Sequence, residues 1–207
     1  MAHSAPPIVY DPAELLRRCD PENRLERYFH LLLEENQRVN LVSRETAVAD
    51  SFGLKRLAAE SLLPLEQLTD LKIDSYLDIG SGGGFPAIPI LLTRQVNYAC
   101  FIERTKKKAA ALKRILVGLN LPATVIDSTF EEYATDTMFD LITARQVKLT
   151  PALLKRILSM LRRTGCLVYF GEPTFTLSTS RMTGITYCYS SDNKVSTGKF
   201  TLFRKQS

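Results

Sequence analysis

The amino-acid sequence predicts an α/β protein in which a doubly wound, mostly parallel sheet follows a helical amino-terminal extension. Residues 12 to about 69 show helical periodicity, whereas from residue 73 short apolar runs alternate with helical patterns. This alternation indicates parallel βαβ units. A glycine-rich stretch follows the first apolar run, where open sheets of this class bind ligands. We expect the extension to cover residues 1–70 and a ligand-binding domain to cover residues 71–207.

The extension is predicted to be built from helices. The segment "ENRLERYFHLLLEENQRVN" places Leu25, Phe29, Leu32 and Leu33 on one face with charged residues opposite. The segment "ETAVADSFGLKRLAAESLLPLEQL" repeats this pattern. The only strand signal in this region is the short run "NLVS" at residues 40–43.

The sheet is predicted from five apolar runs and a carboxyl-terminal hairpin. The runs are "IDSYLDI" (73–79), "YACFIE" (98–103), "ATVID" (123–127), "FDLITA" (139–144) and "CLVYFG" (166–171). Helices should begin near Pro86, Thr105 and Thr150, since Pro86 and Pro151 suit a first helical turn and Thr150 a cap. Gly165 should close the last helix. The tail, "GITYCYSS" and "GKFTLFRK" around "DNK", is typical of an antiparallel hairpin.

Composition excludes several functional classes. The chain has 207 residues, of which 45% are hydrophobic, and its longest apolar runs are far shorter than a membrane span. Its start lacks the pattern of a signal peptide, so we expect a cytoplasmic protein. The four cysteines form no CxxC pair and both histidines lie within the first thirty residues, so we expect no metal site. A net charge of +5 is compatible with binding to nucleic acid, but by itself it does not indicate such binding.

The segment "LDIGSGGGFP" is predicted to bind a nucleoside. Glycines 80, 82 and 84 let the backbone bend sharply and let a ligand approach closely, although a turn without a ligand is the alternative. A phosphate-binding P-loop would need Lys and Ser/Thr where Phe85 and Pro86 stand. The dinucleotide fingerprint would need a small residue in place of Phe85. Neither fingerprint therefore fits this loop.

An acid follows the next predicted strand. Glu103 stands 25 positions after Asp78, and the second strand of a βαβ unit lies beside the first. Its carboxylate can therefore accept hydrogen bonds from both hydroxyls of a ribose bound over the glycines, unless it is an ordinary exposed carboxylate. Because no phosphate is required, S-adenosylmethionine is the expected cofactor.

The order of these segments resembles a known family. The matching motifs are "NLVS", "ESLLPL" (60–65), "LDIGSGGGFPAIPI" (77–90), "IERTKKKAAAL" (102–112), "STFEEY" (128–133) and "FDLITARQV" (139–147). They are similar, over about residues 28 to 171, to the bacterial 16S ribosomal RNA guanine-N7 methyltransferases, the glucose-inhibited division protein B family. The Phe-Pro-x-Ile-Pro sequence after the glycines is the most specific motif.

The resemblance implies a class I methyltransferase (Rossmann-like) fold and a protein that uses S-adenosylmethionine to methylate 16S ribosomal RNA or the small ribosomal subunit. We also expect the protein to be a monomer. The resemblance implies a catalytic, substrate-side role for Arg145, which could also hold an RNA phosphate bidentately unless it forms a surface ion pair. Together, the residues expected to contact the cofactor are Asp78, Gly80, Gly82, Gly84, Phe85, Glu103, Phe130, Glu131 and Arg145.

Four positions depart from the family pattern. The family usually has His at Leu57, Gly at Ala87, Arg at Thr129 and Lys at Phe170. Three of these differences remove a polar or basic group from the expected substrate side. The alternative function is therefore a cofactor-binding protein that associates with RNA or the ribosome with an altered substrate or without methylation. A small-molecule methyltransferase is a third reading, disfavoured because the sequence has no large inserted lid.

Two basic clusters are candidates for holding RNA. The first comprises Arg104 to Lys108 with Lys113 and Arg114, and the second comprises Lys155, Arg156, Arg162 and Arg163. The alternative for each cluster is a solvated helix face. The fourth strand ends in "TARQ", without the Asn/Asp-Pro-Pro-aromatic box of amine methyltransferases, and no Pro-Cys pair is present for attack on a pyrimidine.

Overall fold

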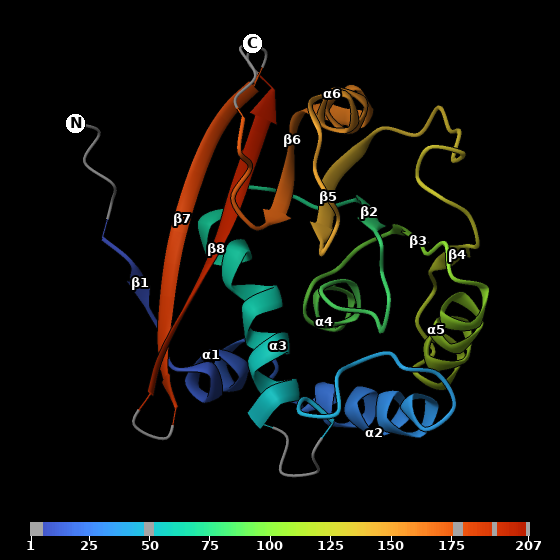
Figure 1. Cartoon of the computed structure of the whole chain (residues 1–207), viewed down its shortest axis with the longest axis vertical. Helices are drawn as coiled ribbons and strands as arrows, with labels where there is room; N and C mark the ends of the chain where they lie inside the picture. The colour runs from blue at the N-terminus through green and yellow to red at the C-terminus, as the bar shows by residue number, and fades with distance from the viewer. Residues whose placement is uncertain (1–5, 48–51, 176–179, 192–193, 206–207) are drawn as a thin grey trace.

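The computed structural model describes residues 6–47, 52–175, 180–191 and 194–205. Its centre is a sheet of eight strands in the order β1-β7-β8-β6-β5-β2-β3-β4 (Figure 1). The strands are β1 (Ile8–Val9), β2 (Ser75–Ile79), β3 (Tyr98–Ile102), β4 (Thr124–Ile126), β5 (Phe139–Arg145), β6 (Leu161–Phe170), β7 (Ser180–Ser191) and β8 (Lys194–Lys205). The helices are α1 (Pro12–Cys19), α2 (Arg24–Asn36), α3 (Phe52–Leu62), the 3-10 helix η1 (Leu63–Gln67), α4 (Ala87–Thr93), α5 (Lys106–Gly118) and α6 (Pro151–Met160).

The strand pairing confirms the predicted parallel sheet. β2 lies at its centre between β3 and β5, and all three run parallel. Every residue of β2 is buried, as expected for a parallel strand with both faces covered. β8 pairs antiparallel with both β6 and β7, which confirms the carboxyl-terminal hairpin over its described residues.

Helices cover the two faces of the sheet unequally. Residues of α1 to α5 pack with Tyr76 and Phe101 in one hydrophobic core. α6 packs with Leu77 and Ile79 on the opposite face. The first core contains residues from both sides of the predicted boundary near residue 70, so apolar packing is continuous from the extension into the sheet.

Two sequence predictions about local structure are wrong. Residues 40–43 form no strand, because the side chain of Asn36 accepts hydrogen bonds from the backbone N–H groups of Leu41 and Val42, at 2.8 and 3.0 Å. Gly165 does not close α6, which ends at Met160, but lies inside β6. A Cβ atom at Gly165 would stand 2.8 Å from the carbonyl oxygen of Phe139, so the glycine permits close approach at the irregular pairing of β5 and β6.

Strand β1 was not predicted from the sequence. Only two residues form it, Ile8 and Val9, and they pair parallel with Tyr187 and Cys188 of β7. The ring of the following Tyr10 makes edge contacts with Tyr187 and Tyr189, at centroid distances of 5.9 and 5.7 Å. These contacts, like the strand pairing, depend on residues far away in the sequence. The amino-terminal segment thus becomes the outer edge of the sheet.

Candidate functional site

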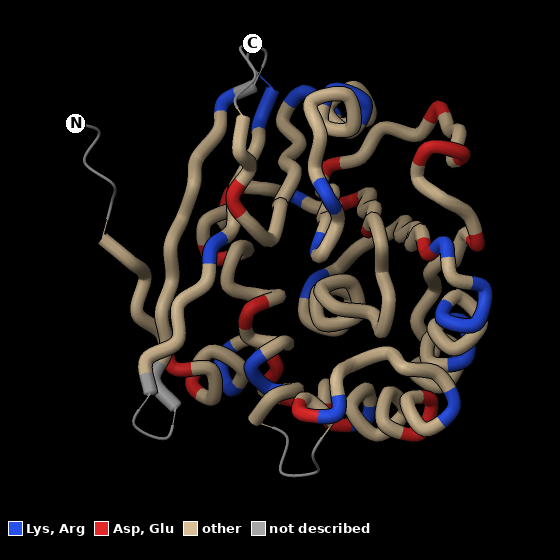
Figure 2. The backbone as a smooth tube through the Cα atoms, viewed as in Figure 1, with Lys and Arg blue, Asp and Glu red and all other residues tan. Residues whose placement is uncertain are grey.

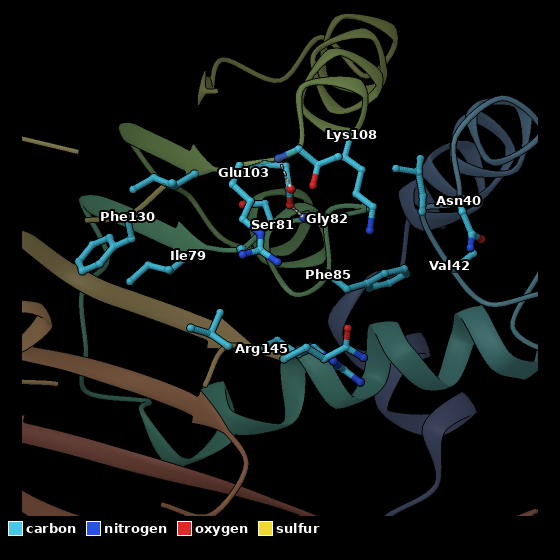
Figure 3. A pocket seen from close by; sticks show the side chains of 18 of the residues that line it. Asn40, Val42, Ile79, Ser81, Gly82, Phe85, Glu103, Lys108, Phe130 and Arg145 are labelled. Atoms are coloured by element: carbon cyan, nitrogen blue, oxygen red, sulfur yellow. Dashed lines mark hydrogen bonds between the residues drawn. The ribbon is translucent and has the colours of Figure 1, made fainter. Parts of the chain in front are cut away.

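A cleft of about 1090 Å³ opens at the carboxyl ends of the central strands β2, β3 and β5 (Figure 3). Its walls come from the turn after β2, the end of β3, the loop after β4, the end of β5, the loop at residues 40–46 and helix α3. Carboxyl ends of adjacent parallel strands are where open α/β sheets bind their ligands. The cleft therefore lies where the sequence placed the nucleoside site.

The glycine turn forms the floor of the cleft. Gly80 and Gly82 line it, and both have the positive φ angles that favour glycine, 77° and 53°. A Cβ atom on Gly82 would meet no atom closer than 3.9 Å, so the space above this residue is open to a ligand. Gly84, with φ of 102°, does not line the cleft, since a Cβ there would stand 2.6 Å from the side chain of Ile88 in α4.

Glu103 faces the glycine turn from the end of β3, as predicted. Its carboxylate accepts hydrogen bonds from the backbone N–H groups of Gly82 (2.9 Å) and Thr105 (2.8 Å). Each bond uses a different oxygen, so each oxygen keeps a further acceptor position, and Glu103 lines the cleft. The side chain is therefore held in a fixed orientation and can still accept hydrogen bonds from a ligand.

Asp78 lies beneath the turn rather than in the wall of the cleft. The residue is fully buried in β2, and one carboxylate oxygen, Oδ1, accepts a hydrogen bond from the hydroxyl group of Thr143. The hydroxyl of Tyr76 in turn lies 2.7 Å from that of Thr143. The second oxygen of Asp78, Oδ2, is buried without a partner among the described residues. Burial raises the pKa of Asp78 from 3.8 to about 6, because the charged form is poorly solvated.

Three further predicted contacts line the cleft. The ring of Phe85 is almost completely buried and packs on Tyr28 of α2, with 5.2 Å between ring centroids. Phe130 is also buried, and the guanidinium group of Arg156 lies over its ring at 5.1 Å. Glu131 is exposed at the cleft edge. Both aromatic rings thus combine core packing with a position on the cleft wall.

Arg145 ends β5 and lies across the cleft from Glu103 (Figure 3). Its Nη2 atom lies 2.6 Å from Glu60 of α3, and its guanidinium group lies 5.3 Å from the centre of the Phe170 ring. The ion pair that the sequence offered as the alternative role of Arg145 is thus present, but it is largely buried, with the Glu60 side chain only 5% exposed. Arg56, one helical turn before Glu60, binds the other carboxylate oxygen at 3.0 Å and also lines the cleft.

Sequence reasoning missed Arg56 and Glu60. The available signal was their i, i+4 spacing on a predicted helix, which often marks only a solvated ion pair. Their position at the cleft results from the packing of α3 beside the end of β5, which the sequence does not show.

The positions that depart from the family pattern lie in different surroundings. Leu57 and Thr129 line the cleft. The ring of Phe170 lies against the guanidinium group of Arg145, and Ala87 is fully buried in α4. Two of the four differences therefore change the surface that a ligand would meet.

The two basic clusters differ in their relation to the cleft. Figure 2 shows Lys and Arg along α5, where Lys106, Lys107 and Lys113 are exposed, and Arg104 just before the helix is exposed as well. Lys108 and Arg104 line the cleft, so this cluster is continuous with the site.

Three of the other basic residues have hydrogen-bond or ion-pair partners, whereas Lys155 and Arg163 are exposed. Arg114, on the same helix, forms two short hydrogen bonds with Glu35. In the second cluster, Arg162 pairs with Asp140 at 3.5 Å, and Arg156 donates to the Tyr133 carbonyl. The cluster on α5 therefore differs from the second cluster in its continuity with the cleft.

The described residues contain no group of three or more His, Cys, Asp or Glu side chains placed to hold a metal ion. None of the helices in the described ranges has both the length and the apolar character needed to cross a membrane.

Comparison with known proteins identifies similar sequences and folds. Residues 21–180 match the GidB family, described as rRNA small subunit methyltransferase G. A ribosomal RNA small subunit methyltransferase G from Mycoplasmopsis pulmonis is 35% identical over 59% of this chain and 52% of its own length, so the match spans about half of that relative. Its counterpart from Helicobacter acinonychis is 33% identical over 70% of this chain and 79% of its own length.

A solved structure has the same fold. The crystal structure of a putative O-methyltransferase from Klebsiella pneumoniae is 17% identical, with a TM-score of 0.63 over 95% of this chain and 96% of that one. At this level of identity the likeness concerns the fold alone, and it confirms the predicted Rossmann-like methyltransferase fold.

Proposed function

The chain belongs to the rRNA small subunit methyltransferase G family, and on this premise we propose that it transfers a methyl group from S-adenosylmethionine to N7 of a guanine in 16S ribosomal RNA. The observation that carries the proposal is the pairing of an open glycine turn with the fixed carboxylate of Glu103 at the carboxyl ends of the strands. We further propose that the protein acts as a cytoplasmic monomer without a metal.

The residues of the cleft fit the cofactor. The space above Gly82 admits a ligand close to the backbone, and Glu103 keeps acceptor positions for two ribose hydroxyls. Phe130 and Glu131 line the same cleft and are proposed to contact the adenine. Asp78 and Gly84 are proposed to contribute to cofactor binding indirectly, through the shape of the turn. Asp78 is buried beneath it, and Gly84 allows the turn to pack closely against Ile88 of α4.

Bound in this cleft, S-adenosylmethionine supplies an electrophilic methyl group on a sulfonium. The chain's task is to hold the acceptor nitrogen in line with that group. Guanine N7 has an accessible lone pair, so the reaction requires no base to remove a proton. Arg145 is proposed to orient the substrate, since it lines the cleft opposite Glu103 and its Nη1 atom has no partner among the described residues.

RNA is proposed to reach the cleft along α5. Arg104, Lys106, Lys107 and Lys113 are exposed there, and Lys108 continues the charge into the cleft. We expect RNA affinity to fall steeply with salt, because each neutralised phosphate releases counterions. The slope of log K against log[salt] should be about 0.7 per contact for a single strand. Fluorescence anisotropy at several salt concentrations measures it, and a flat response would argue against backbone contacts.

The proposed activity is tested by methyl transfer. Small ribosomal subunits, and RNA stripped from them, are taken from a strain that lacks the guanine-N7 enzyme and are incubated with the protein and radiolabelled S-adenosylmethionine. We expect label in 7-methylguanosine after nuclease digestion and chromatography. Label in another nucleoside would contradict the N7 assignment.

A second function is favoured by Leu57 and Thr129, which line the cleft where the family has His and Arg. They would suit a cofactor-binding protein that associates with RNA without methylating it. Accumulation of S-adenosylhomocysteine in the presence of ribosomal RNA separates the two candidates, because only an enzyme produces it. Tight cofactor binding without this product would favour the second function.

A further inference from the structure

One wall of the cleft carries two arginines that share a single buried carboxylate. Arg56 and Arg145 both line the cleft, whereas Glu60 stands behind them. Glu60 Oε1 lies 3.0 Å from Arg56 and Oε2 lies 2.6 Å from Arg145. Because each carboxylate oxygen is used by a different arginine, Glu60 fixes both guanidinium groups at the same wall.

The charges of this cluster do not cancel. Two guanidinium groups face one carboxylate, so the cluster keeps one net positive charge beside the cleft. The side chains of Glu60, Arg145 and Arg56 are 5%, 17% and 30% exposed, so water screens this charge less than it would at the open surface. An anion entering the cleft would meet a charge whose position is already fixed.

Arg145 also keeps an unused donor. Its Nη2 atom binds Glu60, and the face of its guanidinium group rests on the ring of Phe170. Its Nη1 atom is buried without a partner among the described residues. A buried N–H group without an acceptor is costly, so an incoming oxygen that accepts from it would be bound favourably.

We infer that Arg56 and Arg145 form an oxyanion subsite, in which Glu60 is a positioning residue. The inference rests on the proposed function and adds Arg56 and Glu60, which lie outside the predicted site, to the predicted Arg145. Guanidinium groups match the geometry of phosphate and carboxylate oxygens. The occupant is therefore either a phosphodiester group of the RNA or the carboxylate of the cofactor's methionine part.

The subsite is tested with Arg56→Gln, which leaves Arg145 and the glycine turn unchanged. The two probes are a fluorescent single-stranded oligoribonucleotide containing guanosine, measured by anisotropy, and S-adenosylmethionine, measured by calorimetry. We expect one of the two affinities to fall about tenfold or more. A loss confined to the oligonucleotide, with a salt slope lower by about 0.7, identifies the phosphodiester, whereas a loss confined to the cofactor identifies the carboxylate.

Arg18→Gln is the matched control. It also breaks an arginine–glutamate pair, with Glu66, but lies outside the cleft lining. Thermal unfolding of each variant shows whether the chain still folds. If Arg56→Gln and Arg18→Gln leave both affinities at the wild-type value, the subsite is overturned.

Glu60→Gln distinguishes two roles of Glu60, the orientation of the two arginines and the simple lowering of positive charge beside the cleft. Removing a negative charge beside the cleft would tighten binding of an anion if charge alone mattered. If Glu60 positions the arginines, binding of the anion identified with Arg56→Gln should weaken instead, by about tenfold. Tighter binding would contradict the positioning role.

Failure of the inference and failure of the proposed function give different results. A wild-type chain that binds both probes but transfers no methyl group contradicts the proposed function alone, and the comparison with Arg56→Gln still decides the subsite. Methyl transfer by the wild type, together with unchanged affinities for both probes in Arg56→Gln, contradicts the subsite alone.

Discussion

Replacing Glu103 with alanine is expected to weaken S-adenosylmethionine binding at least tenfold. A hydrogen bond to a charged group contributes about 1.5 to 3 kcal/mol, and Glu103 has acceptor positions for two ribose hydroxyls. The substitution also leaves the N–H groups of Gly82 and Thr105 without the acceptor that holds the turn in place. Isothermal titration calorimetry of the folded variant measures the change.

Two further variants sharpen this test. Glu103→Gln keeps the size of the side chain but loses its charge, so its affinity should fall between those of Glu103→Ala and the wild type. Glu172→Ala removes an exposed acid that pairs with Lys199 outside the cleft lining, and should bind normally. If Glu103→Ala lowers stability but not affinity, Glu103 serves only to hold the turn and the ribose assignment is wrong.

The buried carboxyl group of Asp78 is expected to make the protein less stable as the pH rises from about 4 to about 6. Its pKa is about 6 in the folded chain against 3.8 ordinarily, so the folded state keeps a proton that the unfolded state loses. Below this range both states are protonated and the group has no effect. Above about pH 6 the loss in unfolding free energy stays constant, at about 3 kcal/mol, since one unit of pKa corresponds to about 1.36 kcal/mol.

Urea unfolding of the wild type and of Asp78→Asn at several pH values measures this effect. The asparagine cannot ionise, so the difference in unfolding free energy between the two chains should change by about 3 kcal/mol across the range. Glu35→Gln provides a contrast of opposite sign, because the hydrogen bond from Arg114 lowers the pKa of Glu35 and stabilises the fold as the pH rises. A difference for Asp78→Asn that is constant with pH would show that Asp78 has an ordinary pKa.

Local signals were sufficient to predict the parallel sheet. The apolar run that ends at Ile79 is buried at every position of β2, and the glycines after it form the turn that the sequence indicated. Glu103 could be placed opposite Gly82 because the geometry of a βαβ unit fixes neighbouring strand ends.

The errors arose where a particular side-chain hydrogen bond or close contact, rather than periodicity, decides the conformation. Asn36 satisfies the backbone of Leu41 and Val42 and so removes the predicted strand. Gly165 is needed because the carbonyl oxygen of Phe139 in β5 comes close to it. This contact between two strands cannot be read from the helical pattern that precedes Gly165 in the sequence.

The same limit applied to the candidate site. Arg145 was predicted to face the cleft, but its partner Glu60 precedes it by 85 residues and belongs to the extension. Asp78 was predicted to contact the cofactor, but its side chain is fully buried beneath the turn and does not line the cleft, because both faces of β2 are covered. Sequence patterns identify strand ends, whereas burial and pairing at those ends depend on how the helices dock.

The continuous core between the helical extension and the sheet has a consequence for how this lineage can diverge. Tyr28 of α2 donates a hydrogen bond to the carbonyl oxygen of Gly83 at 2.9 Å, so the extension supports the glycine turn itself. A domain joined by a linker can be exchanged or lost as a module, but these helices cannot leave without exposing the floor of the cleft. Substitutions on the cleft surface, as at Leu57 and Thr129, leave this support of the glycine turn in place.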